Sequence, residues 1–261
     1  SAFGHNALKN NTTGSENIAI GAYALDANTT AGKGVAIGTY ALSGNTTGAS
    51  NTAVGYSALG TNSTGNYNVA MGQDALNANT TASNNVSIGF RSMMVNTTGA
   101  NNVAMGFFAL NQNTTGTQNT AIGKDALSSV TTGGSNDGYG RAAGSDITTG
   151  SNNLCVGNLA GTSGSQITLT THTDTIVIGN SSHTASYVKT DWTTGSDQRD
   201  KTDIQDISTG LSFVNQLKPK SFWFRKNRNS TEKSGNKKYG FLAQDILALE
   251  GSNPVVQSVL T

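Results

Sequence analysis

Side chains that often perform chemistry in proteins are few and scattered in this chain of 261 residues. The three histidines, His5, His172 and His183, lie far apart in the sequence and lack the spacing of a metal site. The single cysteine, Cys155, excludes an intrachain disulfide framework. We therefore expect the protein to use neither a metal ion nor another cofactor.

Two carboxylates, Asp74 and Asp125, occupy the same position of a sequence repeat and suggest the acid–base pair of a glycoside hydrolase. Three repeats separate them. If the repeats stack about 4.8 Å apart, the carboxylates lie roughly 14 Å from each other. Paired glycosidase carboxylates are about 5 to 9.5 Å apart, so only a pair between two chains remains open.

The elements that would position any site form a repeat of seventeen residues. Its units read roughly N-V-A-I-G-x-x-A-L-x-x-N-T-T-G-x-x. A fixed period of this length is typical of a solenoid, in which each unit buries its apolar face against its neighbours. Ten glycines mark the predicted coils: Gly4, Gly21, Gly38, Gly55, Gly72, Gly89, Gly106, Gly123, Gly140 and Gly157.

Each unit carries one short stretch with the alternation of a β-strand. β-Branched residues recur with period two in pairs such as Ile18 and Ile20, or Val35 and Ile37. The Asn-Thr-Thr-Gly breaker found in most units leaves no window long enough for an isolated helix. The sequence therefore predicts a mainly β fold, a parallel β-roll or β-helix about 48 Å long.

Equivalent residues of the stacked units form columns. A glycine column suits a tight bend or a positive φ, and an asparagine column suits side-chain bonds to the backbone. The asparagines are Asn17, Asn51, Asn68, Asn85, Asn102, Asn119, Asn136 and Asn153. A further column never holds a bulky side chain, so either the opposite wall of a thin coil or a neighbouring chain packs closely against it. Its members are Ala19, Ala36, Ala53, Ala70, Ser87, Ala104, Ala121 and Cys155.

Charge divides the chain near Gly195. Residues 1–195 hold 6 basic and 8 acidic side chains and no proline, whereas residues 196–261 hold 10 basic and 7 acidic side chains and both prolines. The net charge of +1 gives no reason to expect a nucleic-acid partner, and no run of about 18 apolar residues predicts membrane insertion. The basic residues between Arg225 and Lys238 are expected in a solvated loop. Because Ser1 lies inside a repeat, we expect further chain upstream.

Three motifs follow Gly195 in order. They are Ser196-Asp197-Gln198-Arg199-Asp200-Lys201, then Lys218-Pro219 before Phe222-Trp223-Phe224, and finally Tyr239-Gly240-Phe241-Leu242-Ala243-Gln244. This combination resembles the S74-type intramolecular chaperone domain at the C-termini of phage tail spikes and tail fibres. The repeats are similar to those of β-roll heads in trimeric adhesins and of viral fibre shafts. The resemblance implies a β-solenoid shaft over residues 1–162, a terminal β element and connector over 163–195, and a small α+β chaperone domain over 196–261.

The S74 resemblance also implies a self-cleaving serine peptidase that acts once on its own chain. By position, Ser196 is the nucleophile, Lys201 its base, and Gly195–Ser196 the bond that is cut. Asp197 and Arg199 are supporting residues by the same resemblance. Arg199 could supply the nearby positive charge that helps to keep a lysine neutral. A separation of five residues places the serine and the lysine about 140° apart on a helix, so the dyad must form across a turn or between chains.

This sequence departs from the usual family pattern at two places. Asp200 stands where an apolar residue usually precedes the lysine, and a neighbouring carboxylate favours a protonated lysine. The sequence also stops at Thr261, before the long helices with which the family assembles trimers. We therefore expect further chain after Thr261 in the natural protein.

The leading hypothesis is a homotrimeric viral fibre or spike shaft that acts outside the cell, on the virion, and binds a glycan or protein receptor on the host surface. The residues after each glycine are candidate surface-binding residues, although they equally suit packing between coils: Tyr23, Tyr40, Tyr56, Phe90, Phe107 and Phe108. The alternatives are a polysaccharide-degrading tail spike and a cellular trimeric surface adhesin. Stacked Thr-Thr pairs suggest ice binding, but neighbouring strand residues face opposite sides, so at most one threonine of each pair could line a flat array.

Overall fold

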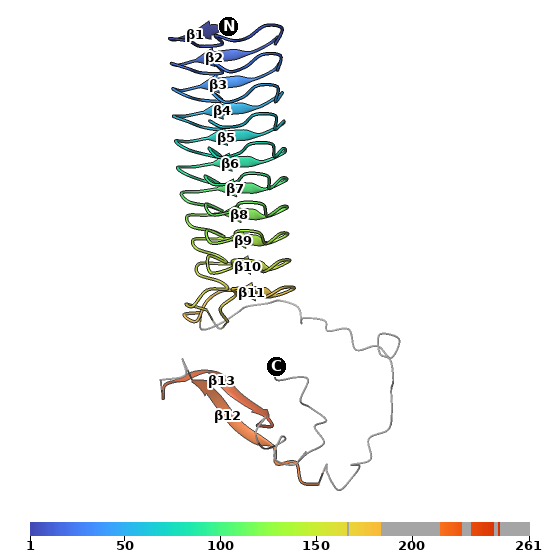
Figure 1. The fold of residues 1–261 in the computed structure, drawn as a ribbon. Coiled ribbons are helices and arrows are strands. Elements are labelled where there is room, and N and C mark those ends of the chain that lie inside the picture. Colours follow the sequence, from blue (N-terminus) through green and yellow to red (C-terminus); the bar gives the residue numbers. More distant parts are fainter. Residues whose placement is uncertain (166, 184–214, 226–230, 243–244, 246–261) are drawn as a thin grey trace, which may run out of the picture. The chain divides into compact units, whose positions relative to one another are not determined.

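A computed structural model of the chain describes residues 1–165, 167–183, 215–225, 231–242 and 245 (Figure 1). The chain divides into two compact units, residues 1–182 and 183–261. In the first unit, eleven short parallel strands stack in sequence order into one sheet. They are β1 (Ala2–Phe3), β2 (Ile18–Ile20), β3 (Val35–Ile37), β4 (Thr52–Val54), β5 (Val69–Met71), β6 (Val86–Ile88), β7 (Val103–Met105), β8 (Thr120–Ile122), β9 (Asp137–Tyr139), β10 (Leu154–Val156) and β11 (Ile176–Ile178).

Every strand pairs with the equivalent residues of the next repeat. Ala36 of β3, for example, lies opposite Ala53 of β4. The last connection is longer, yet Leu154 of β10 still lies opposite Ile176 of β11, so the final strand continues the same sheet. No element of the described solenoid is a helix. The predicted mainly β, parallel solenoid is therefore confirmed.

The glycine column makes the sharp bend after each strand. Its φ angles run from 112° at Gly157 to 143° at Gly106, a region that side-chain-bearing residues rarely adopt. The backbone of the next coil also approaches closely, since a Cβ atom on Gly38 would collide with the carbonyl oxygen of Gly55. Both expectations for this column, a tight bend and a positive φ, are confirmed.

The core of the solenoid is a thin column of small and branched side chains. The middle residue of each strand points inward, and Ala36 and Ala53 are fully buried within the single chain. Leucines of the A-L segment, such as Leu42 and Leu59, complete the core and are equally buried. The opposite wall of a thin coil therefore explains the small-residue column without a neighbouring chain.

Buried asparagines stitch the coils together as the sequence predicts. The Asn68 side chain donates to the carbonyl oxygen of Ala82 at 2.9 Å, and its oxygen accepts from the backbone nitrogen of Asn85 at 3.0 Å. The same pair of bonds recurs along the column, so each asparagine ties its own coil to the next. Buried polar groups satisfied in this way cost the fold little and fix the register of the stack.

The Asn-Thr-Thr-Gly segment forms a second set of ladders. Asn62 donates to Asn45 Oδ1 at 2.8 Å and to the carbonyl oxygen of Gly65 at 2.9 Å. The first threonine of the pair also bonds to the next coil, as Thr46 does through Oγ1 to the carbonyl oxygen of Ser63 at 2.9 Å. The segment is therefore a turn whose side chains hold neighbouring coils together.

This second asparagine ladder ends inside the solenoid. Asn113 donates to Asn96 Oδ1 at 2.7 Å, but Val130 and Ile147 occupy the next two positions of the column. Among the described residues, Asn113 Oδ1 is a buried side-chain oxygen without a hydrogen-bond partner. The last coils therefore replace the polar ladder with an apolar core, which Leu169 extends.

The described part of the second unit is a hairpin. Its strands β12 (Lys220–Arg225) and β13 (Lys233–Gly240) pair antiparallel, with an irregularity between Phe222 and Phe224. The aromatic motif Phe222-Trp223-Phe224 that follows Lys218-Pro219 therefore lies in strand β12. The expected α+β domain as a whole stays a prediction, since much of residues 196–261 lies outside the description.

Candidate functional site

Gly195, Ser196, Asp197, Arg199 and Lys201 all lie outside the described residues. Their roles stay predictions from the sequence motif. The described hairpin of the same unit is therefore the part of the predicted chaperone domain whose geometry can be stated.

Basic and aromatic side chains meet on that hairpin. Lys233 Nζ lies 4.2 Å from the ring centroid of Trp223, and Lys237 Nζ lies 5.3 Å from it. Lys220 of β12 forms an ion pair with Asp245 at 3.9 Å. The sequence predicted a solvated loop for Lys233 and Lys237, whereas both belong to strand β13 and cover an aromatic ring. Cation–π contacts of this kind stabilise exposed sites by about 0.5–1 kcal/mol. We therefore interpret them as contacts that stabilise the hairpin, and not as a ligand-binding site.

The two carboxylates considered for glycoside hydrolysis have separate partners. Asp74 accepts from Arg91 Nε at 3.5 Å, one coil further on, whereas Asp125 pairs with the adjacent Lys124. Each carboxylate thus belongs to a partly exposed ion pair of its own. The described structure gives no support to an acid–base pair within one chain.

The candidate surface-binding aromatics form two stacks along one corner of the solenoid. Tyr23 and Tyr40 lie face to face with ring centroids 5.2 Å apart, and Tyr40 meets Tyr56 edge to face at 6.1 Å. Further along, Phe90 stacks on Phe107 at 5.3 Å, and Phe107 contacts Phe108 at 4.3 Å. Ring faces that contact the neighbouring coil are not open to a flat ligand, so the geometry favours corner packing. Surface binding by these residues stays a prediction.

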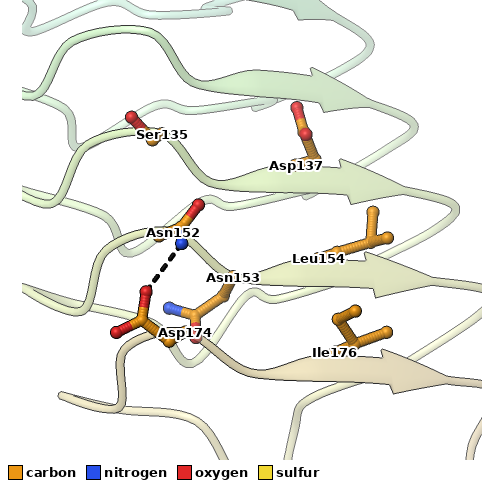
Figure 2. Close-up of a pocket in the computed structure, with 7 residues that line it drawn as sticks. All are labelled: Ser135, Asp137, Asn152, Asn153, Leu154, Asp174 and Ile176. Atoms are coloured by element: carbon orange, nitrogen blue, oxygen red, sulfur yellow. Dashed lines mark hydrogen bonds between the residues drawn. The ribbon is translucent and has the colours of Figure 1, made fainter. Parts of the chain in front are cut away.

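A shallow pocket of about 230 Å³ lies near the end of the solenoid (Figure 2). Asp137 of β9, Leu154 of β10 and Ile176 of β11 line one side of it, and Asn152 donates to Asp174 Oδ1 at 2.6 Å on the other. Both carboxylates are at least partly exposed. Across the described ranges, no group of three or more histidine, cysteine, aspartate or glutamate residues could hold a metal ion. The pocket is therefore a surface depression with one hydrogen-bonded pair.

Cys155 occupies the small-residue column and is buried in the core. Burial raises the pKa of its thiol to about 11, because the charged thiolate loses its hydration there. The thiolate is the reactive form of cysteine. We conclude that Cys155 fills space in the core and is not a nucleophile.

The raised pKa leads to a test of this conclusion. At pH 8, we expect iodoacetamide to alkylate Cys155 in the folded protein on the order of 100-fold more slowly than in the protein unfolded by guanidinium, which serves as the control. Because the folded state holds its proton more tightly, the free energy of unfolding should fall as the pH rises from the ordinary thiol pKa toward about 11. Equal alkylation rates in the two states would show that Cys155 is accessible.

One feature with functional meaning was not predicted from the sequence. The first and third residues of each strand point away from the core, and those of β2 to β11 form what we call the outer face. Mid-shaft members such as Ile37, Met71, Met105 and Ile122 are each 37–40% exposed. The alternation in the sequence left this open, because a three-residue strand can turn either its small middle residue or its two larger side chains toward the core.

The comparisons with known proteins identify the C-terminal segment. Residues 196–252 match the family model Peptidase S74, described as the chaperone of endosialidase. No curated protein and no solved structure gives a significant match to the chain. A parallel β-solenoid followed by this segment fits a tail-fibre-like protein with an S74 chaperone domain. Within the described residues, no helix is long and apolar enough to cross a membrane.

Proposed function

We propose that this chain is the shaft of a viral tail fibre or spike that attaches the particle to a host surface. The observation that carries the proposal is the order of its parts: the S74 match begins at residue 196, after an eleven-stranded parallel β-solenoid. The rod holds attachment surfaces away from the particle. Its receptor is a glycan or a protein of the host cell surface.

We assign residues 1–162 to the shaft, 163–195 to a terminal β element and connector, and 196–261 to the chaperone domain. In this scheme the C-terminal domain brings three chains together and then cuts the Gly195–Ser196 bond. Each strand pairs with the strand of the next repeat, so a partly formed rod exposes an unpaired strand edge at its growing end. Holding three chains at one end raises their local concentration and favours correct assembly over aggregation.

Assembly tests the proposal directly. We expect the mass of the particle in native solution, measured by light scattering, to be three times the mass of the chain measured under denaturing conditions. The matched control is the same sample after complete denaturation, which should return the single-chain mass. A stable, folded monomer across micromolar concentrations would contradict the proposed trimeric fibre.

A further inference from the structure

The outer face of the solenoid is apolar over almost its whole length. In the mid-shaft strands its two columns hold valine, isoleucine, threonine and methionine, and Asp137 is the charged residue on the face from β2 to β11. Strands β1 to β11 are stacked without interruption, so the face continues unbroken along the unit (Figure 1). Other positions of the repeats are both polar and exposed, among them Thr98, Asn101 and Thr115.

The face is as large as the largest apolar patch of a typical monomer, a size at which such patches often have a function. Nine strand spacings of about 4.8 Å separate β2 from β11 and give a length of about 43 Å, and two side-chain columns make a band roughly 10 Å wide. A flat band of this size covers about 430 Å². Contiguous apolar patches above a few hundred Å² usually mark an interaction site.

The periodicity of the face points to another copy of this chain as the partner. Side chains repeat at every strand, so the face is a row of evenly spaced ridges and grooves. Only a rod with the same spacing can match these ridges over the full length, and a second parallel copy has that spacing by construction. The scarcity of charge on the face argues against a polyanionic partner, which would require basic residues.

We propose that the outer face is the surface through which copies of this chain pack against one another, in parallel and in register around a common axis. The number of copies, three, rests on the proposed function. The choice of face does not, because it comes from the exposed side chains of β2 to β11. In this arrangement the same residue of every chain approaches the axis at the same height.

Asp137 is the exception that makes the proposal specific. It occupies the first position of β9, where β3, β5, β6 and β7 carry valine. Packing in register brings the Asp137 carboxylates of all copies together in an apolar environment. Like charges repel there, and the loss of water penalises each of them. The carboxylate therefore weakens the assembly at its C-terminal end.

Cysteine cross-linking tests the face in the full chain. Met105→Cys places a thiol on the outer face of β7, and Thr115→Cys places one on an exposed position of the same repeat outside that face. Under mild oxidation we expect covalent dimers from Met105→Cys, and at least tenfold less cross-linking from the control variant Thr115→Cys. Cys155 is buried and should not contribute. Circular dichroism verifies that both variants are folded.

A second variant needs no cross-link. Asp137→Val removes the repelling carboxylates, so we expect the melting temperature of the assembly to rise by at least about 3 °C. Thr115→Val is the control for a gain in exposed apolar surface outside the face, and should shift the melting temperature much less.

The outcomes separate the two proposals. If the native particle is a trimer but Met105→Cys cross-links no better than Thr115→Cys, another surface holds the chains together and the choice of face is wrong. If the native particle is a monomer, neither variant cross-links, and both the face and the proposed trimeric fibre fail. An unchanged or lower melting temperature for Asp137→Val would place Asp137 in solvent and contradict packing around it.

Discussion

Ser196→Ala and Lys201→Ala are each expected to leave the chain uncut, while wild-type protein loses its C-terminal domain. Loss of a nucleophile or its base typically lowers the rate of such a reaction by a factor on the order of 10³ or more, so cleavage should be undetectable over days. Ser208→Ala and Lys226→Ala are matched controls within the same segment but outside the motif, and should be cut like wild type. Denaturing mass spectrometry of the natural full-length protein measures the result.

The reaction behind this expectation has two steps. Ser196 Oγ attacks the carbonyl carbon of Gly195 and gives up its proton to neutral Lys201. Protonated Lys201 would return the proton to the nitrogen of Ser196 as the peptide C–N bond breaks, so that Ser196 becomes a free amine, Gly195 is held as an ester on the Ser196 oxygen, and the lysine is neutral again. Water then hydrolyses the ester and leaves Gly195 with a terminal carboxylate. Glycine before the nucleophile helps, because its backbone can adopt a strained turn that other residues resist.

Asp200 provides an independent test of the lysine's role. A carboxylate beside Lys201 stabilises the protonated amine, which cannot act as a base. Asp200→Leu should therefore accelerate cleavage. Asp200→Asn also removes the charge but keeps a polar side chain beside Lys201, so it should accelerate cleavage less if desolvation helps to keep the lysine neutral. Cutting of Ser196→Ala at the wild-type rate would refute the dyad, and a natural wild-type protein that stays uncut over days would make residues 196–261 a chaperone without peptidase activity.

The columns of the solenoid were predictable from the sequence because each column repeats one local requirement. A glycine with positive φ, an alanine in a thin core and an asparagine that reaches the next coil recur as predicted in Gly38, Ala36 and Asn68. Each of these roles can be inferred from the residue type that recurs at a single position of the repeat. The strand at Phe222–Phe224 could also be predicted from local information, because aromatic residues favour strands.

Other features depend on contacts that no single repeat reveals. Asn-Thr-Thr-Gly has the composition of a turn, and only the stacked coils show that Asn62 bonds to Asn45. The alternation of a three-residue strand fits either face inward, so it does not say that Met105 points outward and Ala104 inward. The end of the ladder at Asn113 likewise follows from Val130 in the next coil.

Removal of one whole repeat, Gly72–Ile88, is expected to leave a folded but shorter rod. The deletion joins Met71 to Gly89, which has the same place in the repeat as Gly72, so every column continues across the joint. Asn62 would then meet Asn96 in the buried ladder, in the geometry that it has with Asn79 at 2.7 Å. The cost is limited to one interface between neighbouring coils, because solenoid contacts are nearest-neighbour.

Removal of only eight residues, Gly72–Asn79, should destabilise the fold far more, although this deletion is about half as long as a repeat. The joint then carries too few residues for a coil, and every later residue is shifted relative to the columns before it. Polar side chains would face buried alanines, and asparagines that now bond to each other would be left without partners, at about 1–3 kcal/mol each. We expect loss of cooperative melting by circular dichroism and rapid proteolysis at the joint, whereas the seventeen-residue deletion keeps both a sharp transition and protease resistance. Equal tolerance of the two deletions would contradict the nearest-neighbour stacking on which the rod depends.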